Sequence, residues 1–97
     1  GSLRKYKDIL GVATPQDALD KILGTQVYRF HYKEGMGTQD KLTEYVGVIG
    51  EEALWAMHYG GGVVNPVNTL GYMVLGVQAL HERIRQLEDK VIEFTKI

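Results

Sequence analysis

Two side chains near the start of the chain, Ser2 and Lys7, are of types that carry out acyl chemistry, and they lie five positions apart. A serine hydroxyl is inert at neutral pH unless a neighbouring base takes its proton. A lysine amine acts as that base only where desolvation or nearby positive charge lowers its pKa. Arg4 and Lys5 bring positive charge close in the sequence. The spacing alone occurs often by chance, so its meaning depends on the elements around it.

Other polar side chains give weaker indications of chemistry. His31, His58 and His81 share no spacing typical of metal ligands, so we interpret them as exposed or hydrogen-bonded histidines. Glu51 and Glu52 stand together at an expected helix start, where carboxylates stabilise the positive end of the helix dipole. We therefore expect no metal site and no cofactor.

The composition indicates one small domain. Its 97 residues are enough for one modest core but not for two. The 11 basic and 12 acidic residues give a formal charge of −1, which predicts neither a nucleic-acid partner nor a membrane partner. The chain has no cysteine, which excludes disulfides, and no run of roughly 18–20 apolar residues that would predict a membrane span.

An unbroken heptad ladder occupies the last third of the chain. Its apolar residues alternate at spacings of three and four, which makes consecutive a/d pairs. The period of about 3.5 residues keeps them on one side of a helix and favours a left-handed supercoil. They are Leu70, Val77, Ile84 and Val91 at a, and Met73, Leu80, Leu87 and Phe94 at d.

The ladder predicts self-association, because an amphipathic helix must bury its apolar seam. The alternative is that the seam packs on the head of its own chain, but strict a/d spacing favours a partner chain. Arg83 at g and Glu88 at the following e can meet across two helices. The β-branched residues at a favour two strands. The apolar face is wider than a dimer seam, which favours three, because of Leu70 at a, Met73 and Phe94 at d, and Val74 at e.

The first half of the chain predicts a short helix and a strand. Residues 2–9 are expected to be extended. A helix follows between an N-cap at Thr14, with Pro15 at its first position, and a C′ glycine at Gly24. Residues 26–33 alternate as a half-buried strand with an aromatic inner face, and residues 34–40 form a polar loop.

The second half predicts a strand and two helices. Tyr45–Ile49 is the second short strand. A helix opens at Glu51, contains Trp55 as a core residue and stops at the glycines of 60–62. A brief extended link follows at 63–64, and an N-cap at Asn68 leads into the long helix.

The order of these elements resembles the intramolecular chaperone auto-processing domain at the C-terminal end of phage tail fibres, tail spikes and endosialidases. The resemblance covers essentially the whole chain. The family's Ile-Gly-Phe-Ile-Ala-Gln-Glu-Val pattern is matched with Gly47, Ile49 and Glu52 in equivalent places. The segments that carry the resemblance are Ala18–Leu23, Tyr28–Lys33, Tyr45–Ala53, Val63–Pro66 and Leu70–Leu80.

The resemblance implies a domain that trimerises, helps an upstream β-rich stalk to fold in register, and then cuts itself off with a Ser-Lys dyad. Transferred to this chain, it makes Ser2 the nucleophile and Lys7 the base, and the bond before Ser2 is cut. The partners are then further copies of the chain and the stalk of the same precursor. The domain acts in the host cytoplasm during virion assembly and is absent from the mature fibre after cleavage.

The chain departs from the family at Leu3, where the family usually has aspartate. Gly1-Ser2 is also a dipeptide that expression vectors leave at an N-terminus, and under that interpretation the spacing to Lys7 is coincidental. Two other functions stay open. One is a retained trimerisation cap that needs no Ser2, and the other is an unrelated oligomeric binding module, for which the ladder is the evidence.

We therefore predict an α+β fold, with a small mixed helix and strand head followed by a long C-terminal helix that forms a trimeric coiled coil. Residues 1–66 form the head with its N-terminal cleavage segment, and residues 67–97 form the coiled-coil helix of the same chaperone domain. The activity that the resemblance predicts is that of a serine peptidase that turns over once, on its own precursor.

Overall fold

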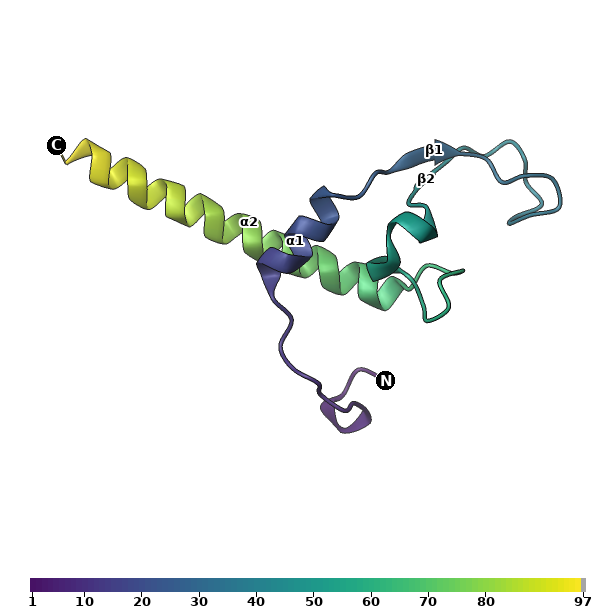
Figure 1. Ribbon diagram of the computed structural model, residues 1–97, viewed down its shortest axis with the longest axis horizontal. Coiled ribbons are helices and arrows are strands. Elements are labelled where there is room, and N and C mark those ends of the chain that lie inside the picture. The colour runs from purple at the N-terminus through teal and green to yellow at the C-terminus, as the bar shows by residue number, and fades with distance from the viewer. Residues whose placement is uncertain (97) are drawn as a thin grey trace.

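The computed structural model describes residues 1–96 and has an α+β fold, as predicted. Within this part lie a short helix α1 (Pro15–Leu23), a two-stranded antiparallel sheet of β1 (Tyr28–Phe30) and β2 (Tyr45–Gly47), and a long C-terminal helix α2 (Pro66–Thr95). Single 3₁₀ turns cover Arg4–Tyr6, Gly50–Glu52 and Leu54–Ala56. Figure 1 shows α2 as the longest element, with α1 against it and the sheet on a projecting arm.

Helix α2 begins at Pro66, one residue before the predicted boundary between head and helix. Its N-cap is Asn65 and not Asn68 as predicted. The Asn65 side-chain oxygen accepts the backbone N–H of Asn68 at 3.2 Å. Proline explains the shift, since its fixed φ and missing N–H suit the first helical position and place the cap just before it. The helix continues for 30 residues and carries the whole heptad ladder on one element.

Helix α1 begins and ends where predicted. Pro15 is its first residue, and the Thr14 carbonyl accepts the Ala18 N–H at 3.2 Å, although in residues 1–96 the Thr14 hydroxyl makes no capping bond. Gly24 follows in the right-handed region, with φ −83°, so the predicted left-handed C′ glycine is wrong. The end of the helix is capped instead by the Thr25 hydroxyl, which donates to the Lys21 carbonyl of the last turn at 2.7 Å.

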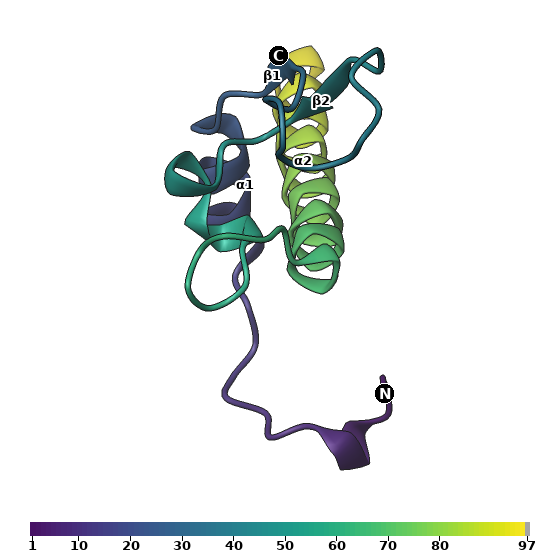
Figure 2. The same cartoon turned by 90° about the vertical axis from the view of Figure 1, so that its right-hand side faces the viewer.

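The two helices pack where both carry small side chains, and Figure 2 shows them side by side. The buried residues are Gly76 and Ala79 on α2, and Ala18 and Leu19 on α1. A Cβ added at Gly76 would lie 3.0 Å from the end of the Ile22 side chain, so the two helices pack closely here and a larger residue would displace Ile22. Gly76 and Ala79 hold heptad positions g and c, so α1 packs beside the g flank of the a/d seam and leaves the a and d side chains exposed.

The sheet is a short ribbon in which Tyr28 pairs with Gly47 and Phe30 with Tyr45. Both strands are shorter than predicted, since β1 spans 28–30 instead of 26–33 and β2 ends two residues early. The predicted aromatic inner face is wrong for Tyr28 and Tyr32, which are exposed. Phe30, Tyr32 and Tyr45 pack on one another, with ring centroids 5.3 to 5.7 Å apart. A two-stranded ribbon without a covering layer cannot bury both of its faces.

The segment between the sheet and α2 forms the 3₁₀ turns Gly50–Glu52 and Leu54–Ala56, where the sequence predicts one α-helix. Ala53 separates the turns, with φ −141° and ψ 56°, and is fully buried. Together with Ala56 and Met57 it forms the small core of the head. Two 3₁₀ turns with the buried Ala53 between them thus take the place of the predicted continuous helix.

Trp55 ties this core to both helices. Predicted as a core residue, it is half-buried, and its indole N–H donates to the Thr25 hydroxyl at 3.0 Å. Its ring centroid lies 4.9 Å from that of Tyr72 on α2. The predicted extended link at 63–64 is confirmed as a single antiparallel bridge between Val64 and Met57.

The molecule is elongated and exposes much of its apolar surface. Its extents are 65 × 38 × 19 Å and its radius of gyration is 18.5 Å, against roughly 13 Å for a compact chain of 100 residues. Its accessible surface is 8465 Å², against about 5,600 Å² for a compact protein of 10.9 kDa. Among the described residues no large side chain is fully buried. Much apolar area therefore stays exposed in the single chain.

The two glycines of α2 provide a matched test of the helix packing. Leucine at Gly76 meets Ile22, so Gly76→Leu should lower the free energy of unfolding by about 1–3 kcal/mol. Leucine at Gly71 meets nothing within 4 Å, so Gly71→Leu should raise it by up to about 1 kcal/mol through helix propensity. Denaturant unfolding followed by circular dichroism measures both. Equal effects at the two positions would contradict the packing described.

Candidate functional site

The N-terminal segment folds back on itself and brings Lys7 to Ser2. The predicted extended conformation is wrong over Arg4–Tyr6, which form a 3₁₀ turn in which Tyr6 N–H donates to the Leu3 carbonyl at 3.1 Å. The Lys7 ammonium donates to the Ser2 backbone carbonyl at 3.1 Å. The turn therefore brings the Lys7 side chain to the backbone of Ser2, where it hydrogen-bonds the carbonyl oxygen and not the hydroxyl of the predicted nucleophile.

The surroundings of this pair are open. Residues 1–14 of the chain are all exposed, and Leu10, at 99%, is the extreme case. Figure 1 shows the segment leading away from α1, with the turn near its far end. Gly1 lies against the ring of Tyr6, because a Cβ added there would be 2.7 Å from a ring carbon. A single chain thus brings the two groups together but does not enclose them.

The heptad seam is the largest functional candidate, and the head leaves it uncovered. Its eight side chains are between 50% and 77% exposed, with Leu80 at the lower end and Phe94 at the upper end. The alternative that the seam packs on its own head is wrong, since α1 lies over Gly76 and Ala79 on another side of α2. A continuous apolar stripe of this length marks an interaction surface.

The charges on α2 lie off the seam. Arg85 bonds Glu82 at 2.6 Å and Asp89 at 2.8 Å, one turn away in each direction, and the guanidinium lowers the pKa of the Glu82 carboxyl. These pairs stiffen the outer face of the helix. Within the described chain, Arg83 at g and Glu88 at e form no such ion pair, so both flanks of the seam keep their charges for other contacts.

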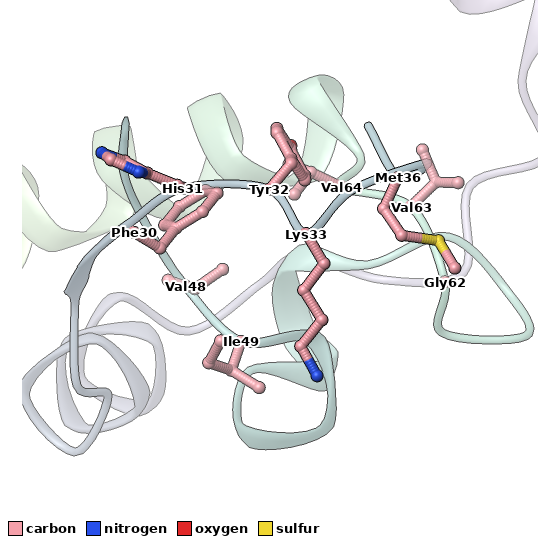
Figure 3. A pocket seen from close by; sticks show the side chains of 10 residues that line it. All are labelled: Phe30, His31, Tyr32, Lys33, Met36, Val48, Ile49, Gly62, Val63 and Val64. Atoms are coloured by element: carbon pink, nitrogen blue, oxygen red, sulfur yellow. The ribbon is translucent and has the colours of Figure 1, made fainter. Parts of the chain in front are cut away.

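A groove of about 720 Å³ lies between the sheet arm and the loop that precedes α2. Figure 3 shows Met36 and Gly62 on one side of it, and Val48 and Ile49 at its base. Lys33 is the lysine among the lining residues, and most of the others are apolar. The residues around it are Phe30, His31, Tyr32, Lys33, Met36, Val48, Ile49, Gly62, Val63 and Val64.

The predicted loop at 34–40 is closed by one lysine. The Lys41 ammonium donates to three backbone carbonyls, those of Lys33 at 3.0 Å and of Met36 and Thr38 at 2.9 Å. Asp40 then caps the turn that follows, and a hydrogen bond from the Thr43 hydroxyl lowers the pKa of its carboxyl. Met36 is thereby held on a structured loop next to the groove.

The remaining candidates serve structure. Glu52 accepts the Tyr28 hydroxyl at 2.8 Å, and this bond raises the pKa of Tyr28. Among residues 1–96, no three histidine, aspartate or glutamate side chains gather as a metal site. In the same part of the chain, none of the helices has the length and apolarity needed to cross a bilayer.

Comparison of the chain with protein families, with curated proteins and with solved structures gives no match. Ser2 and Lys7 are the predicted site residues, and the structure brings them together. Sequence reasoning missed Lys41, because its partners are backbone carbonyls that any sequence carries.

Lys41→Met should loosen the loop while leaving the sheet intact. The substitution keeps the length of the side chain but removes the donor to three carbonyls, so the backbone amides of 33–41 should exchange several-fold faster. Hydrogen exchange read by mass spectrometry checks this. Lys33→Met removes the same charge beside the groove and is the control. Similar exchange in both variants would show that Lys41 does not close the loop.

Proposed function

We propose that this chain is a C-terminal intramolecular chaperone that trimerises, assists the folding of a homotrimeric phage fibre or spike, and releases itself by autoproteolysis before Ser2. The observation that carries the proposal is the uncovered heptad seam, which runs along α2 on a side that the head does not touch. A chain that keeps such a stripe exposed is built to associate through it.

The size of the exposed surface supports association with more than one partner. The accessible area exceeds that of a compact chain of this mass by about half. A trimer gives each chain two interfaces, and each interface of standard size covers about 800 Å² of it. Val74 at e extends the apolar stripe beyond a/d, as a three-stranded coil requires.

The partner of the trimer is the β-rich stalk of the same precursor. Three copies of α2 in parallel would hold three stalk chains at one end, so that strands from different chains begin pairing in register. Long-range strand pairing is slow because loop-closure entropy opposes it, and a trimeric clamp lowers that cost. The process takes place in the host cytoplasm during virion assembly.

The cleavage step needs the Lys7 amine to move from the Ser2 carbonyl, its partner in the single chain, to the hydroxyl of the same residue. The neutral Lys7 amine takes the proton of the Ser2 hydroxyl as its Oγ bonds to the carbonyl carbon of residue 1. The bond between that carbon and the Ser2 nitrogen then breaks, and the proton passes to the nitrogen as it leaves. Water hydrolyses the resulting ester, which gives a carboxyl group on residue 1 and restores the Ser2 hydroxyl. The protein turns over once.

Assembly supplies what a single chain lacks at this site. The pair is exposed to water in one protomer, so a single chain provides no desolvated surroundings for it. Neighbouring protomers and the folded stalk would cover the segment and bring its charges together, which favours the neutral amine. Cleavage would then follow assembly. A retained trimerisation cap is the second candidate, favoured by the departure at Leu3.

The first prediction of this proposal concerns mass. Sedimentation equilibrium over a range of concentrations should give three times the chain mass of 10.9 kDa. Ile84→Lys places like charges in a buried a layer and should reduce the species to one chain mass. Gln86→Lys adds the same charge two residues away on the outer face and should leave the trimer intact. A wild-type species of one or two chain masses would contradict the trimer.

The second prediction concerns a precursor that carries a β-rich stalk before residue 1. Wild type should cut once, between residues 1 and 2, and mass spectrometry reads the products. Ser2→Ala removes the nucleophile, and Lys7→Arg removes a titratable base because arginine stays protonated. Both should remain full-length yet trimeric. Lys5→Arg is the matched control and should be processed normally. Processing of Ser2→Ala at the same bond would leave the retained cap as the function.

A further inference from the structure

Leu23, the last residue of α1, is exposed and lies about 200° around the helix from Lys21. Lys21 lies on the opposite edge, where its ammonium is 3.5 Å from the hydroxyl of Tyr72 at heptad position c. Ile22 comes next and contacts Gly76 at position g. Successive helical residues turn by about 100°, so Leu23 continues this rotation past g, toward the seam. Its exposed fraction is 69%.

Val74 is exposed on the other flank of the same seam. It holds position e and its exposed fraction is 57%. Along α2 it lies between Tyr72 and Gly76, the residues that α1 contacts, so it is at the height of Leu23. Positions e and g flank the seam on opposite sides, so Leu23 and Val74 of one chain cannot reach each other.

The charges on α2 favour a parallel arrangement of its copies. Position g carries Arg83 and Lys90, and position e carries Glu88. In a parallel coiled coil, the g flank of each helix meets the e flank of the next, which pairs Arg83 with Glu88. An antiparallel arrangement would bring the basic g flanks together, and like charges would then face each other.

We infer that α1 of each protomer is part of the subunit interface, with its Leu23 packed on Val74 of the next protomer. The inference rests on the proposed trimer and names the surface that completes it. The g flank of each helix carries α1, and the neighbour presents its e flank to that side. The contact is heterologous, since two different edges meet, and three such contacts close a ring.

The contact gives the head a role in assembly. Helix α1 would lie between its own α2 and the α2 of a neighbour, so a misfolded head would leave a gap in the ring. The exposed leucine at 23 and the exposed valine at 74 would both be covered by one contact. Association through the seam and folding of the head are then coupled, and a correctly folded head becomes a condition for a closed trimer.

A cysteine pair tests the contact directly, because the chain has no cysteine of its own. The variant with Leu23→Cys and Val74→Cys is oxidised, or bridged with a short bis-maleimide, and separated on a denaturing gel. A closed ring of contacts predicts a covalent band at three chain masses. The variants with Leu23→Cys alone and Val74→Cys alone are the controls and should give no such band.

The outcomes separate this inference from the proposed function. Sedimentation of the doubly substituted chain under reducing conditions gives its mass before oxidation. A trimer that yields no covalent trimer overturns the contact and leaves the proposed function standing. A covalent dimer without a trimer band indicates a reciprocal contact and also overturns it. If wild type itself has the mass of one chain, both the proposed function and the contact fall.

Leu23→Glu gives a second test that does not depend on cross-linking. Because Leu23 is exposed in the single chain, the new charge should leave the fold of the head unchanged. It should weaken the trimer and raise the dissociation constant of the trimer at least tenfold. Leu42→Glu makes the same change at a leucine that is 92% exposed on the sheet arm, and it should leave the constant unchanged. Equal constants for the two variants would overturn the contact.

Discussion

The close approach of α1 to α2 at Gly76 and Ala79 is the constraint on which the rest of the structure depends. Small side chains on positions g and c hold the head to one side of the long helix. Larger residues there would push the head outward or turn it toward the seam. The same two residues therefore hold the head to α2 and leave the a and d side chains of the apolar stripe exposed in the single chain.

The core of the head is modest for a chain that must fold. It consists of alanines, a leucine and a methionine, and its most enclosed members are the smallest. Burial of such residues contributes little apolar area, so marginal stability is expected of the isolated chain. Side-chain hydrogen bonds, such as that from Trp55 to Thr25, and the Lys41 ammonium add order where apolar contact is scarce. Stability gained on association would then decide how much of the chain is folded.

How far the sequence predicts this structure depends on how local each signal is. The heptad ladder and the bounds of α1 follow from periodicity and from proline at the first helical position, so they were predictable. The break at Ala53 was not, because Ala53 is a good helix former and its residue type does not signal the buried, non-helical conformation that it adopts. The turn at Arg4–Tyr6 was missed because its apolar and basic residues also suit an extended chain. The pairing of Lys7 with the Ser2 hydroxyl stays a prediction, and the hydrogen bond from Lys7 to the Ser2 backbone carbonyl carries no sequence signal, because every residue has such an acceptor.

The segment at 8–13 connects the turn at the N-terminus to α1 without a helix or strand. Six residues span at most about 20 Å when extended. This segment is a tether, and the N-terminal turn at its end can reach positions within that distance of α1 while α1 stays packed on α2. Within that distance, the effective concentration of the N-terminal turn around its own head is in the millimolar range typical of short flexible linkers. Ile9, Leu10 and Val12 are the apolar side chains of this tether. Their burial would make docking of the whole tether favourable once an apolar surface is within reach.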